Sequence, residues 1–293
     1  MKKSNHNVAP FSIYTVIIYA IIIALCVMTL YPFVFTIAGS FNNGIDYGLG
    51  GVWLYPRKFT LANYQVILSD PLLYKVIVRT VLVTLASVLT HVFFTSLVAF
   101  AMSRKELKCR NFFWNYALVT MFFGGGMIPG YLLIRMLGLY DTYFVYVIPS
   151  MFSVYNMIII SNFFSSIDKG MRESAYIDGA SEFRIWWSIY LPLSTPVLAT
   201  VALWVAVGKW NAFMPTLIYT DTTKNDLWLL QFYMVRIIKY ADTPDIDKSI
   251  LDLVSGKTIE YAAIVVSSLP IILLYPFLSR FLAKGIMVGS LKG

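Results

Sequence analysis

The sequence predicts an all-α polytopic membrane protein with six transmembrane helices, and three observations support this fold class. Of its 293 residues, 58% are hydrophobic and only 13% are charged, whereas a soluble domain carries about 25% charged residues. Several long runs contain no Asp, Glu, Lys or Arg, and each is long enough for the roughly 20 residues that cross a bilayer as a helix. The net charge of +8 lies in the connections between these runs, which argues against a nucleic-acid-binding surface.

The uncharged runs place the six helices at 12–36, 78–102, 112–134, 143–165, 197–219 and 260–282. These segments must be helical because lipid cannot satisfy free backbone groups. The first apolar run is about twice as long as that of a signal peptide and has no clean cleavage site, so we expect an uncleaved helix. The fifth helix is expected to begin after Pro196, because Pro192 and Pro196 disfavour a helix that runs through them.

The positive charges predict the orientation of the chain. With six helices, one side of the membrane receives twelve cations and five acids, and the rest of the chain holds eleven cations and ten acids. The positive-inside rule therefore places both termini in the cytoplasm, with outer segments at 39–76 and 220–258. We divide the chain into an N-terminal helix with its outer segment (1–77), a transmembrane domain (78–282) and a C-terminal tail (283–293).

Residues that carry enzymatic chemistry are sparse. Cys26 lies in the first helix and Cys109 in a cytoplasmic connection, so they cannot pair, and both histidines are isolated in the sequence. No metalloprotease or nucleophile-elbow signature occurs. Residues 255–258 read Ser-Gly-Lys-Thr, as at the end of a phosphate-binding loop, but Leu251 stands where that loop needs a glycine and the stretch is expected outside. We expect no enzymatic activity and no bound cofactor in this chain.

The connection at 168–192 does not look like a loop. Helix-forming residues run from Met171 to Asp178, Gly179 interrupts them, and a second amphipathic stretch continues to Tyr190. The glycine permits a sharp change of direction between two short helices. Trp186 and Trp187 are expected to hold this element against the membrane. Periodicity alone leaves two interpretations open, an interfacial anchor and a docking element for a soluble partner.

The spacing in this segment resembles the EAA signature of permeases from binding-protein-dependent ABC importers, E-A-A, x3, G, x9, I-x-L-P. Here Glu173-Ser-Ala175 is followed by Gly179, Ile189 and Leu191-Pro192, with Ser174 in place of the first alanine. In that family this coupling segment docks on the ATPase subunit. The resemblance implies ATPase-coupling roles for Arg172, Glu173, Ala175, Asp178, Gly179, Ile189, Leu191 and Pro192.

Other parts of the chain resemble sugar-type members of that family. These parts are Phe59–Tyr64, Ala101–Lys105, Trp210–Phe213 with Pro215, and a C-terminal Val288–Gly293 that is similar to maltose-type permeases. The C-terminal resemblance implies that Gly289, Lys292 and Gly293 contact the ATPase subunits. Phe122–Pro129 is similar to a branch that handles complex oligosaccharides, including the smaller permeases of alginate-oligosaccharide importers.

The resemblance implies a type I importer permease in the bacterial cytoplasmic (inner) membrane that moves an oligosaccharide, such as an acidic alginate-like one, inward by alternating access. The implied partners are a second, homologous permease, two ATPase subunits that hold ATP and Mg²⁺, an extracytoplasmic solute-binding protein and membrane lipid, with no nucleic acid. One alternative is a permease for amino acids or metals. Another is an ion-coupled secondary transporter, which would need acidic residues inside the spans.

Several residues inside the expected spans are candidates for the substrate pathway. Lys209 is the one charge in the interior of a span, away from its edges; it either lines the pathway and favours acidic sugars, or forms an ion pair or snorkels. Trp204, Trp210, Asn211 and Tyr155 offer stacking faces and an amide, against the alternative of simple packing. Gly125, with Gly124, Gly126 and Pro129, is expected to bend or break the third span, or to allow close helix packing.

The outer segment 220–258 combines an apolar stretch at 227–238 with an acid-rich tract at 242–252. The apolar stretch is expected either at the membrane interface, with its apolar side toward lipid, or as a cap over the ends of the spans.

Overall fold

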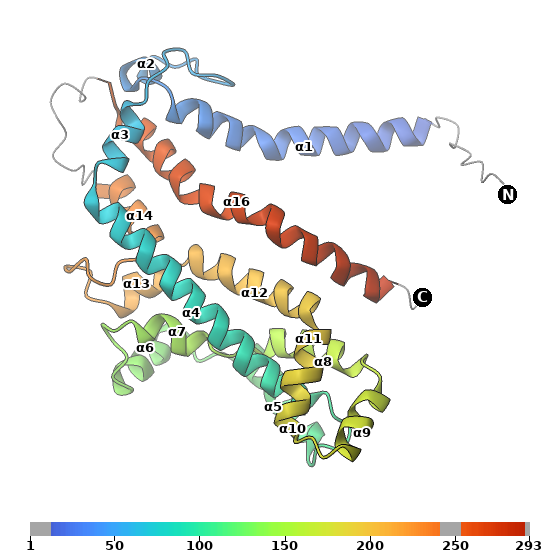
Figure 1. Cartoon of the computed structure of the whole chain (residues 1–293). Coiled ribbons are helices and arrows are strands. Elements are labelled where there is room, and N and C mark those ends of the chain that lie inside the picture. The colour runs from blue at the N-terminus through green and yellow to red at the C-terminus, as the bar shows by residue number, and fades with distance from the viewer. Residues whose placement is uncertain (1–12, 241–252, 291–293) are drawn as a thin grey trace. The chain divides into compact units, whose positions relative to one another are not determined.

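The computed structural model describes residues 13–240 and 253–290, and the side chains up to residue 238 and from 253 to 273 (Figure 1). The described residues are almost entirely helical, and their only β-type pairing is a single bridge between Asn42 and Phe59. The chain forms two compact units, one of residues 1–70 and 237–266 and the other of residues 71–236 and 267–293. Each unit is described separately below.

Three helices are long and apolar enough to cross a membrane alone, and they lie where the sequence predicts the first, second and sixth spans. They are α1 (Ile13–Ser40), α4 (Pro71–Met102) and α16 (Gly256–Ser290). Helix α1 buries no side chain before Ala38, so nearly all of its apolar surface is exposed. Such a helix requires an apolar surrounding, which supports its assignment to the membrane.

The other three spans are bent pairs of helices rather than single rods. The third consists of α5 (Arg110–Phe122) and α6 (Met127–Met136), which bend by 111°. The expected break at Gly124–Gly126 is confirmed, and Gly126 supplies a φ of +81° that few other residues adopt. The fourth span consists of α7 (Phe144–Val147) with the 3-10 turn η1 (Ile148–Ser150), and of α8 (Val154–Ser165), bent by 49°.

The fifth span differs from the single helix expected at 197–219, because its bent pair joins the helical stretch Glu182–Leu193 to Thr195–Trp210 at 83°. Helix α12 runs over Thr195–Trp210, and a separate short helix, α13, covers Met214–Tyr219. Pro215 accounts for the interruption, because it has no N–H to donate to the carbonyl of Asn211 and its ring crowds that carbonyl. Helix α12 begins at Thr195, before the start expected after Pro196, so Pro196 lies in its first turn, where a helix tolerates proline.

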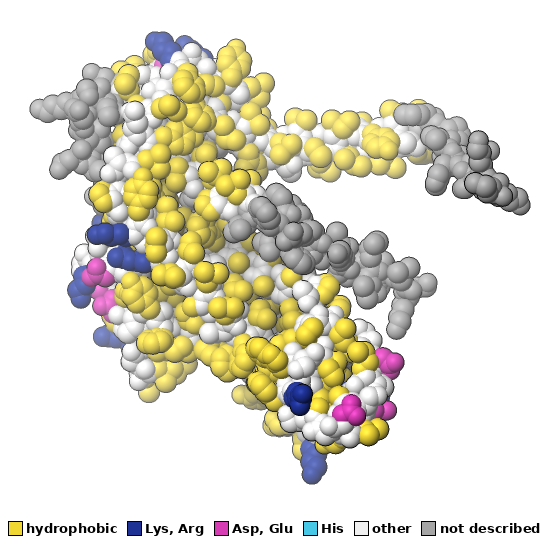
Figure 2. Space-filling model, viewed as in Figure 1, with side chains coloured by type: hydrophobic (Ala, Val, Ile, Leu, Met, Phe, Trp, Pro, Cys, Tyr) yellow, Lys and Arg dark blue, Asp and Glu magenta, His cyan; other side chains and the backbone are white. Residues whose placement is uncertain are grey.

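The core of the second unit forms where α4 packs against α8 and α12, as Figure 1 shows. The buried side chains of this cluster come from all three helices and from the segment that precedes α12. They include Phe100, Ile160, Phe164, Trp186 and Val201. Elsewhere the unit keeps a largely hydrophobic surface, and Figure 2 shows charged side chains only in a few separate groups on this face.

The apolar stretch at 227–238 packs against the protein. Most of it lies in helix α14 (Leu230–Tyr240), and Trp228, Leu229, Leu230 and Phe232 are all buried. The backbone N–H of Leu230 also donates to Thr80 Oγ1 of α4 at 2.8 Å. Of the two interpretations of this stretch, the arrangement favours a cap on the ends of the spans and argues against a helix at the membrane interface. The acid-rich tract at 242–252 lies outside the described residues.

In the first unit, two short helices follow α1: α2 (Gly44–Gly48) and α3 (Ala62–Leu68). Asn63 of α3 is fully buried and joins the ends of two spans. Its amide donates to the carbonyls of Ser40 and Asn42, both at 2.9 Å, and accepts from Thr258 Oγ1 of α16 at 2.7 Å. The bond to Ser40 O satisfies a carbonyl that α1 leaves free at its C-terminus, and the bond to Asn42 O fixes the chain just after it.

Candidate functional site

The segment at 168–192 forms two short helices, as the sequence predicts. Helix α9 (Lys169–Ile177) begins at Asp168, whose side chain accepts the N–H of Gly170 at 3.0 Å. Helix α10 (Glu182–Ile185) begins at Ser181, whose hydroxyl accepts the N–H of Arg184 at 3.3 Å. Both caps satisfy N–H groups that a helix start leaves without a partner.

Gly179 makes the turn between these helices. Its φ is +77°, and it lies in the C′ position of a Schellman motif. The N–H of Gly179 donates to Tyr176 O at 3.1 Å, and the N–H of Ala180 donates to Ala175 O at 2.9 Å. A residue with a Cβ would pay about 1–2 kcal/mol for this left-handed conformation. The glycine of the EAA-like pattern therefore has a specific backbone role.

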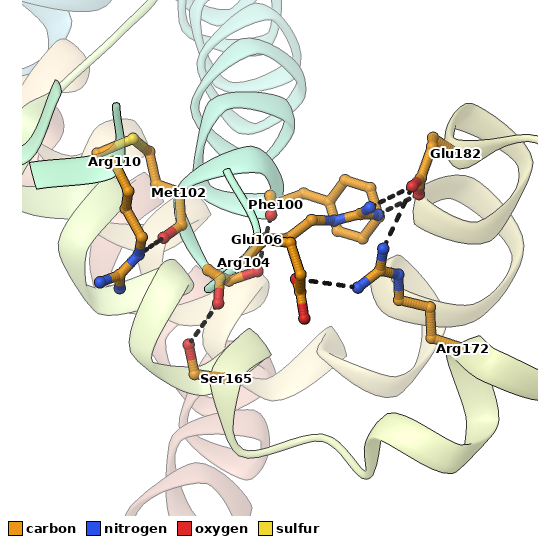
Figure 3. A network of polar contacts seen from close by, with 9 residues as sticks. Phe100, Met102, Arg104, Glu106, Arg110, Ser165, Arg172 and Glu182 are labelled. Atoms are coloured by element: carbon orange, nitrogen blue, oxygen red, sulfur yellow. Dashed lines mark hydrogen bonds and ion pairs between the residues drawn. The ribbon is translucent and has the colours of Figure 1, made fainter. Parts of the chain in front are cut away.

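Four charged side chains tie this segment to the connection between α4 and α5 (Figure 3). The two terminal nitrogens of the Arg104 guanidinium, Nη1 and Nη2, donate to the two carboxylate oxygens of Glu182. Arg172 of α9 lies 3.4 Å from Glu182 and 3.4 Å from Glu106. Arg104 also stacks over the Phe100 ring, 4.1 Å from its centroid. This charged network fixes α9 and α10 against the end of α4.

The network also sets the ionisation of Glu182. The hydrogen bonds from Arg104 lower the pKa of this carboxyl, against the opposing effect of its partial burial. A carboxyl with a lowered pKa stabilises the folded state above its ordinary pKa and loses that contribution as the pH falls through the lowered value. The Arg104–Glu182 pair is therefore fully formed at neutral pH.

Other residues of the EAA-like pattern divide between two faces. Ala175 packs against the buried core cluster, where a small side chain lets α9 approach closely. Glu173 and Asp178 are exposed, and the described residues hold no ion pair to either. Tyr176 and Ile177 beside them are 60% and 87% exposed. The exposed face of α9 and the residue after it is therefore partly acidic and partly apolar.

The second half of the pattern joins α10 to α12. Residues Trp186–Tyr190 form a π-helix, η2, which continues into α11 (Leu191–Leu193) before an 83° bend into α12. Ile189 and Leu191 pack against the core cluster, whereas Pro192 is exposed in the first turn of α11. The expectation that both tryptophans hold the segment against the membrane is wrong for Trp186, which is fully buried in the protein core, and stays a prediction for the exposed Trp187.

Lys209 bonds a backbone carbonyl at the break of the fourth span. Its Nζ donates to Tyr146 O of α7 at 2.5 Å. The hydroxyl of Ser150 donates to the same carbonyl at 3.3 Å. Because α7 is too short for its carbonyls to find partners further along a regular helix, these side chains supply the missing donors. Lys209 as a whole is half-buried.

Three polar residues of α4, spaced four apart, face the same break. Ser87 Oγ lies 3.5 Å from Tyr146 O, His91 Nδ1 lies 2.5 Å from Ser150 O, and Thr95 Oγ1 lies 3.5 Å from Met151 O. His91 Nε2 accepts from the Asn156 amide at 2.9 Å, which assigns the proton of the neutral ring to Nδ1. We did not predict this polar stripe from the sequence, although the i, i+4, i+8 spacing of Ser87, His91 and Thr95 places them on one face of a helix.

The remaining pathway candidates do not converge on one point. Tyr155 of α8 and Trp204 of α12 are half-exposed and lie together, with ring centroids 6.2 Å apart. Trp210 is buried, and its Nε1 donates to Ser267 O of α16 at 2.9 Å. Asn211 caps α12 and accepts from Gln231 at 3.5 Å, and Gly125 is exposed in the break of the third span.

The tail residues lie at the edge of the described region. Gly289 falls in the last turn of α16, and Lys292 and Gly293 lie outside the described residues.

These features define a helical membrane protein with a solvent-exposed pair of short helices, α9 and α10, between two spans. Residues 73–288 match the family described as the binding-protein-dependent transport system inner membrane component. The chain belongs to this family.

Individual relatives cover nearly the whole chain. Protein LplC of Bacillus subtilis (strain 168) is 36% identical over 91% of this chain and 90% of LplC. The polygalacturonan/rhamnogalacturonan transport system permease protein YtcP of the same organism is 34% identical over 96% of this chain and 99% of YtcP. A chain in the crystal structure of a bacterial ABC transporter involved in the import of the acidic polysaccharide alginate has a TM-score of 0.84, with 28% identity over 93% of this chain and 99% of that chain.

The charged network yields a prediction about the segment 168–192. Arg104→Gln removes the two charged bonds to Glu182, and since Glu182 is 45% exposed the loss is expected to be roughly 1 kcal/mol. Amide hydrogen exchange in α9 and α10 of the purified importer should become faster. Lys105→Gln removes an exposed neighbouring charge and should leave the exchange unchanged. Equal exchange in both variants would show that the network does not hold the segment.

Proposed function

We propose that this chain is a permease subunit of an ATP-driven importer that moves an oligosaccharide inward by alternating access. Membership of a binding-protein-dependent transport family carries the transport role and weighs against an ion-coupled secondary transporter. The carbohydrate substrate is supported by relatives named for polygalacturonan and rhamnogalacturonan, trehalose and maltose, and arabinooligosaccharides. The same relatives weigh against an amino-acid or metal substrate.

We further propose that the substrate is acidic and alginate-like. The YtcP relative is named for polygalacturonan, and the structural relative imports alginate. Both are polymers of uronic acids, each with a carboxylate on its sugar ring. Lys209 fits such a substrate, because its ammonium gives one hydrogen bond to Tyr146 O and an ammonium has three N–H groups.

The proposed pathway uses the exposed aromatic pair first. Tyr155 and Trp204 lie on facing helices and offer two ring faces on which a sugar can stack. Gly125 and Asn211, which lie at breaks in spans, remain candidates because discontinuous helices often form transporter sites. Trp210 remains a candidate from sequence, although its ring is buried and its N–H is bonded in this conformation.

ATP and Mg²⁺ belong, in this proposal, to two separate ATPase subunits, so this chain needs no cofactor of its own. The outward surface of α9, with Glu173, Asp178 and Ile177, is the proposed ATPase contact. Arg172 contributes by fixing α9 through Glu106 and Glu182. Gly289, Lys292 and Gly293 are proposed to reach the same subunits. A second, homologous permease and an extracytoplasmic solute-binding protein complete the assembly.

Normal coupling is expected to depend on the shape and charge of α9. Glu173→Lys reverses an exposed charge that offers a charge-assisted contact, and Gly179→Pro removes the left-handed turn. Both variants should insert into the membrane but lose substrate-stimulated ATP hydrolysis in the reconstituted importer. Lys105→Glu, a charge reversal outside the segment, serves as the control. Normal stimulated hydrolysis in both test variants would identify the segment as an anchor only.

The proposed topology places both termini in the cytoplasm, as the charge distribution predicts. In intact cells, a membrane-impermeant thiol reagent should label Asp245→Cys from outside and should not label Ser181→Cys. The native Cys26 and Cys109 are first replaced by alanine. Labelling of Ser181→Cys would show that the orientation is the opposite of the one proposed.

The acidic substrate is tested by removing the charge of Lys209 in two ways. Lys209→Met removes both the charge and the bond to Tyr146 O, whereas Lys209→Gln removes the charge and keeps an N–H donor. With an effective dielectric near 20, a carboxylate about 4 Å away is attracted by about 4 kcal/mol. Both variants should therefore reduce uptake of uronate oligomers in proteoliposomes by about tenfold or more.

Uptake of neutral oligomers of the same length is the control and should not fall. If Lys209→Gln imports uronate oligomers at the original rate while Lys209→Met does not, Lys209 acts through its hydrogen bond alone. If the importer takes up only neutral oligomers, the proposal of an acidic substrate is wrong, and the proposal that the chain is an oligosaccharide permease is unaffected.

A further inference from the structure

The loop between α2 and α3 exposes an unusual cluster of large apolar side chains. Leu49, Trp53, Leu54 and Tyr55 are 74%, 66%, 62% and 73% exposed, whereas Val52 between them is buried. Contiguous exposed apolar side chains of this size mark an interaction surface, because water solvates them poorly. We call residues 49–55 the aromatic loop.

The aromatic loop is held in place by a buried carboxylate. Asp46 is 2% exposed and accepts from the Asn42 amide at 3.2 Å. Arg57 lies 3.4 Å from Asp46 and donates to Gly50 O at 2.5 Å. A Cβ on Gly51, which has a φ of +84°, would lie 2.8 Å from the Arg57 guanidinium. The exposed side chains therefore project from a fixed scaffold, so their exposure is a built feature of the loop.

The neighbours of the loop set its depth in the membrane. A pocket of the first unit is lined by Tyr31 and Phe35 of α1 and by Val52 and Trp53 of the aromatic loop. Tyr31 and Phe35 precede the end of α1 at Ser40 by nine and five residues, or about 14 and 8 Å at 1.5 Å per residue. The loop thus turns back along α1 instead of continuing away from its end.

Near Phe35, that depth corresponds to the boundary between lipid headgroups and acyl chains, and Tyr31 lies one turn deeper. Helix α1 has 28 residues, more than the roughly 20 that cross the hydrocarbon, so its final turns extend into the headgroup region. Trp and Tyr prefer this boundary because each has an apolar ring and a polar group. Lys58 lies 4.0 Å from Asp46, but its side chain is 70% exposed beside the loop, so its ammonium group also suits the lipid phosphates.

We propose that the aromatic loop is an interfacial membrane anchor, which inserts Trp53, Leu54 and Tyr55 into the leaflet where α1 ends. The occupant of this surface is lipid, because the loop adjoins, at Tyr31 and Phe35, the largely exposed apolar surface of α1, which is long and apolar enough to span a bilayer. The anchor fixes the depth of α1, a helix that buries none of its side chains before Ala38. This role of the aromatic loop does not depend on which substrate the importer carries.

The test uses the assembled importer, reconstituted in phosphatidylcholine–phosphatidylglycerol bilayers with Cys26→Ala and Cys109→Ser. An environment-sensitive NBD probe is attached at Trp53→Cys or at Tyr55→Cys, one site per sample. Lipids with a doxyl quencher near the headgroup, or deep in the acyl chain, report the depth of the probe. Gln65→Cys, exposed on α3, is the aqueous control, and Phe33→Cys, exposed on α1, is the membrane control.

At both loop positions the emission should be shifted to shorter wavelength than at Gln65, and the headgroup-proximal doxyl lipid should quench it most. Water-like emission without quenching would show that the loop lies in solvent and would overturn the proposal. A blue-shifted emission that no doxyl lipid quenches would also overturn it, because the loop would then be covered by a partner protein. Two probe positions guard against a local effect of one substitution.

Discussion

Backbone carbonyls freed by broken helices must find donors inside the protein, because the bilayer core offers no water to them. The break of the fourth span frees the carbonyls of Tyr146, Ser150 and Met151. Side chains from α4 and α12 lie within bonding distance of each of them. The close packing of α4 against α8 and α12 depends on this arrangement, since without those donors the break would be costly.

The same helices connect the segment at 168–192 to the break of the fourth span. The charged network fixes α9 and α10 to the end of α4, and the π-helix and α11 lead directly into α12. Near the other end of α12, Lys209 bonds the break of the fourth span. A displacement of α9 by a partner therefore has a continuous, packed route to the aromatic pair on α8 and α12. Every step of this route is a contact between residues of the second unit.

The sequence predicts the elements of this fold better than their contacts. Uncharged runs overlap the three long helices and the three bent pairs, and Gly124–Gly126 lies at one of the breaks because glycine acts on the local backbone. Pro196 lies just after another break, at Ser194. The interruption before α13 was missed even though Pro215 carries its signal. Trp186 looked interfacial because amphipathic spacing does not say whether an apolar side faces lipid or protein.

Contacts between distant residues have no local signal. Arg104 and Glu182 are 78 positions apart, and each looks in sequence like an ordinary surface charge. The partner of Lys209 is harder still to predict, because it is a main-chain carbonyl 63 positions away and has no side-chain identity. The stripe of Ser87, His91 and Thr95 is intermediate: its spacing is visible in the sequence, but its target is defined only by the fold.

The nature of the partner of Lys209 bears on what the lysine does. An acidic partner would cancel the charge and leave a neutral pair, whereas a carbonyl dipole solvates the ammonium and leaves its full positive charge in place. Among the described residues, the ion pairs formed by acidic groups do not include Lys209. The fold thus reduces the desolvation cost of a lysine inside the membrane without neutralising it. A group held in this way can both brace a broken span and attract a carboxylate.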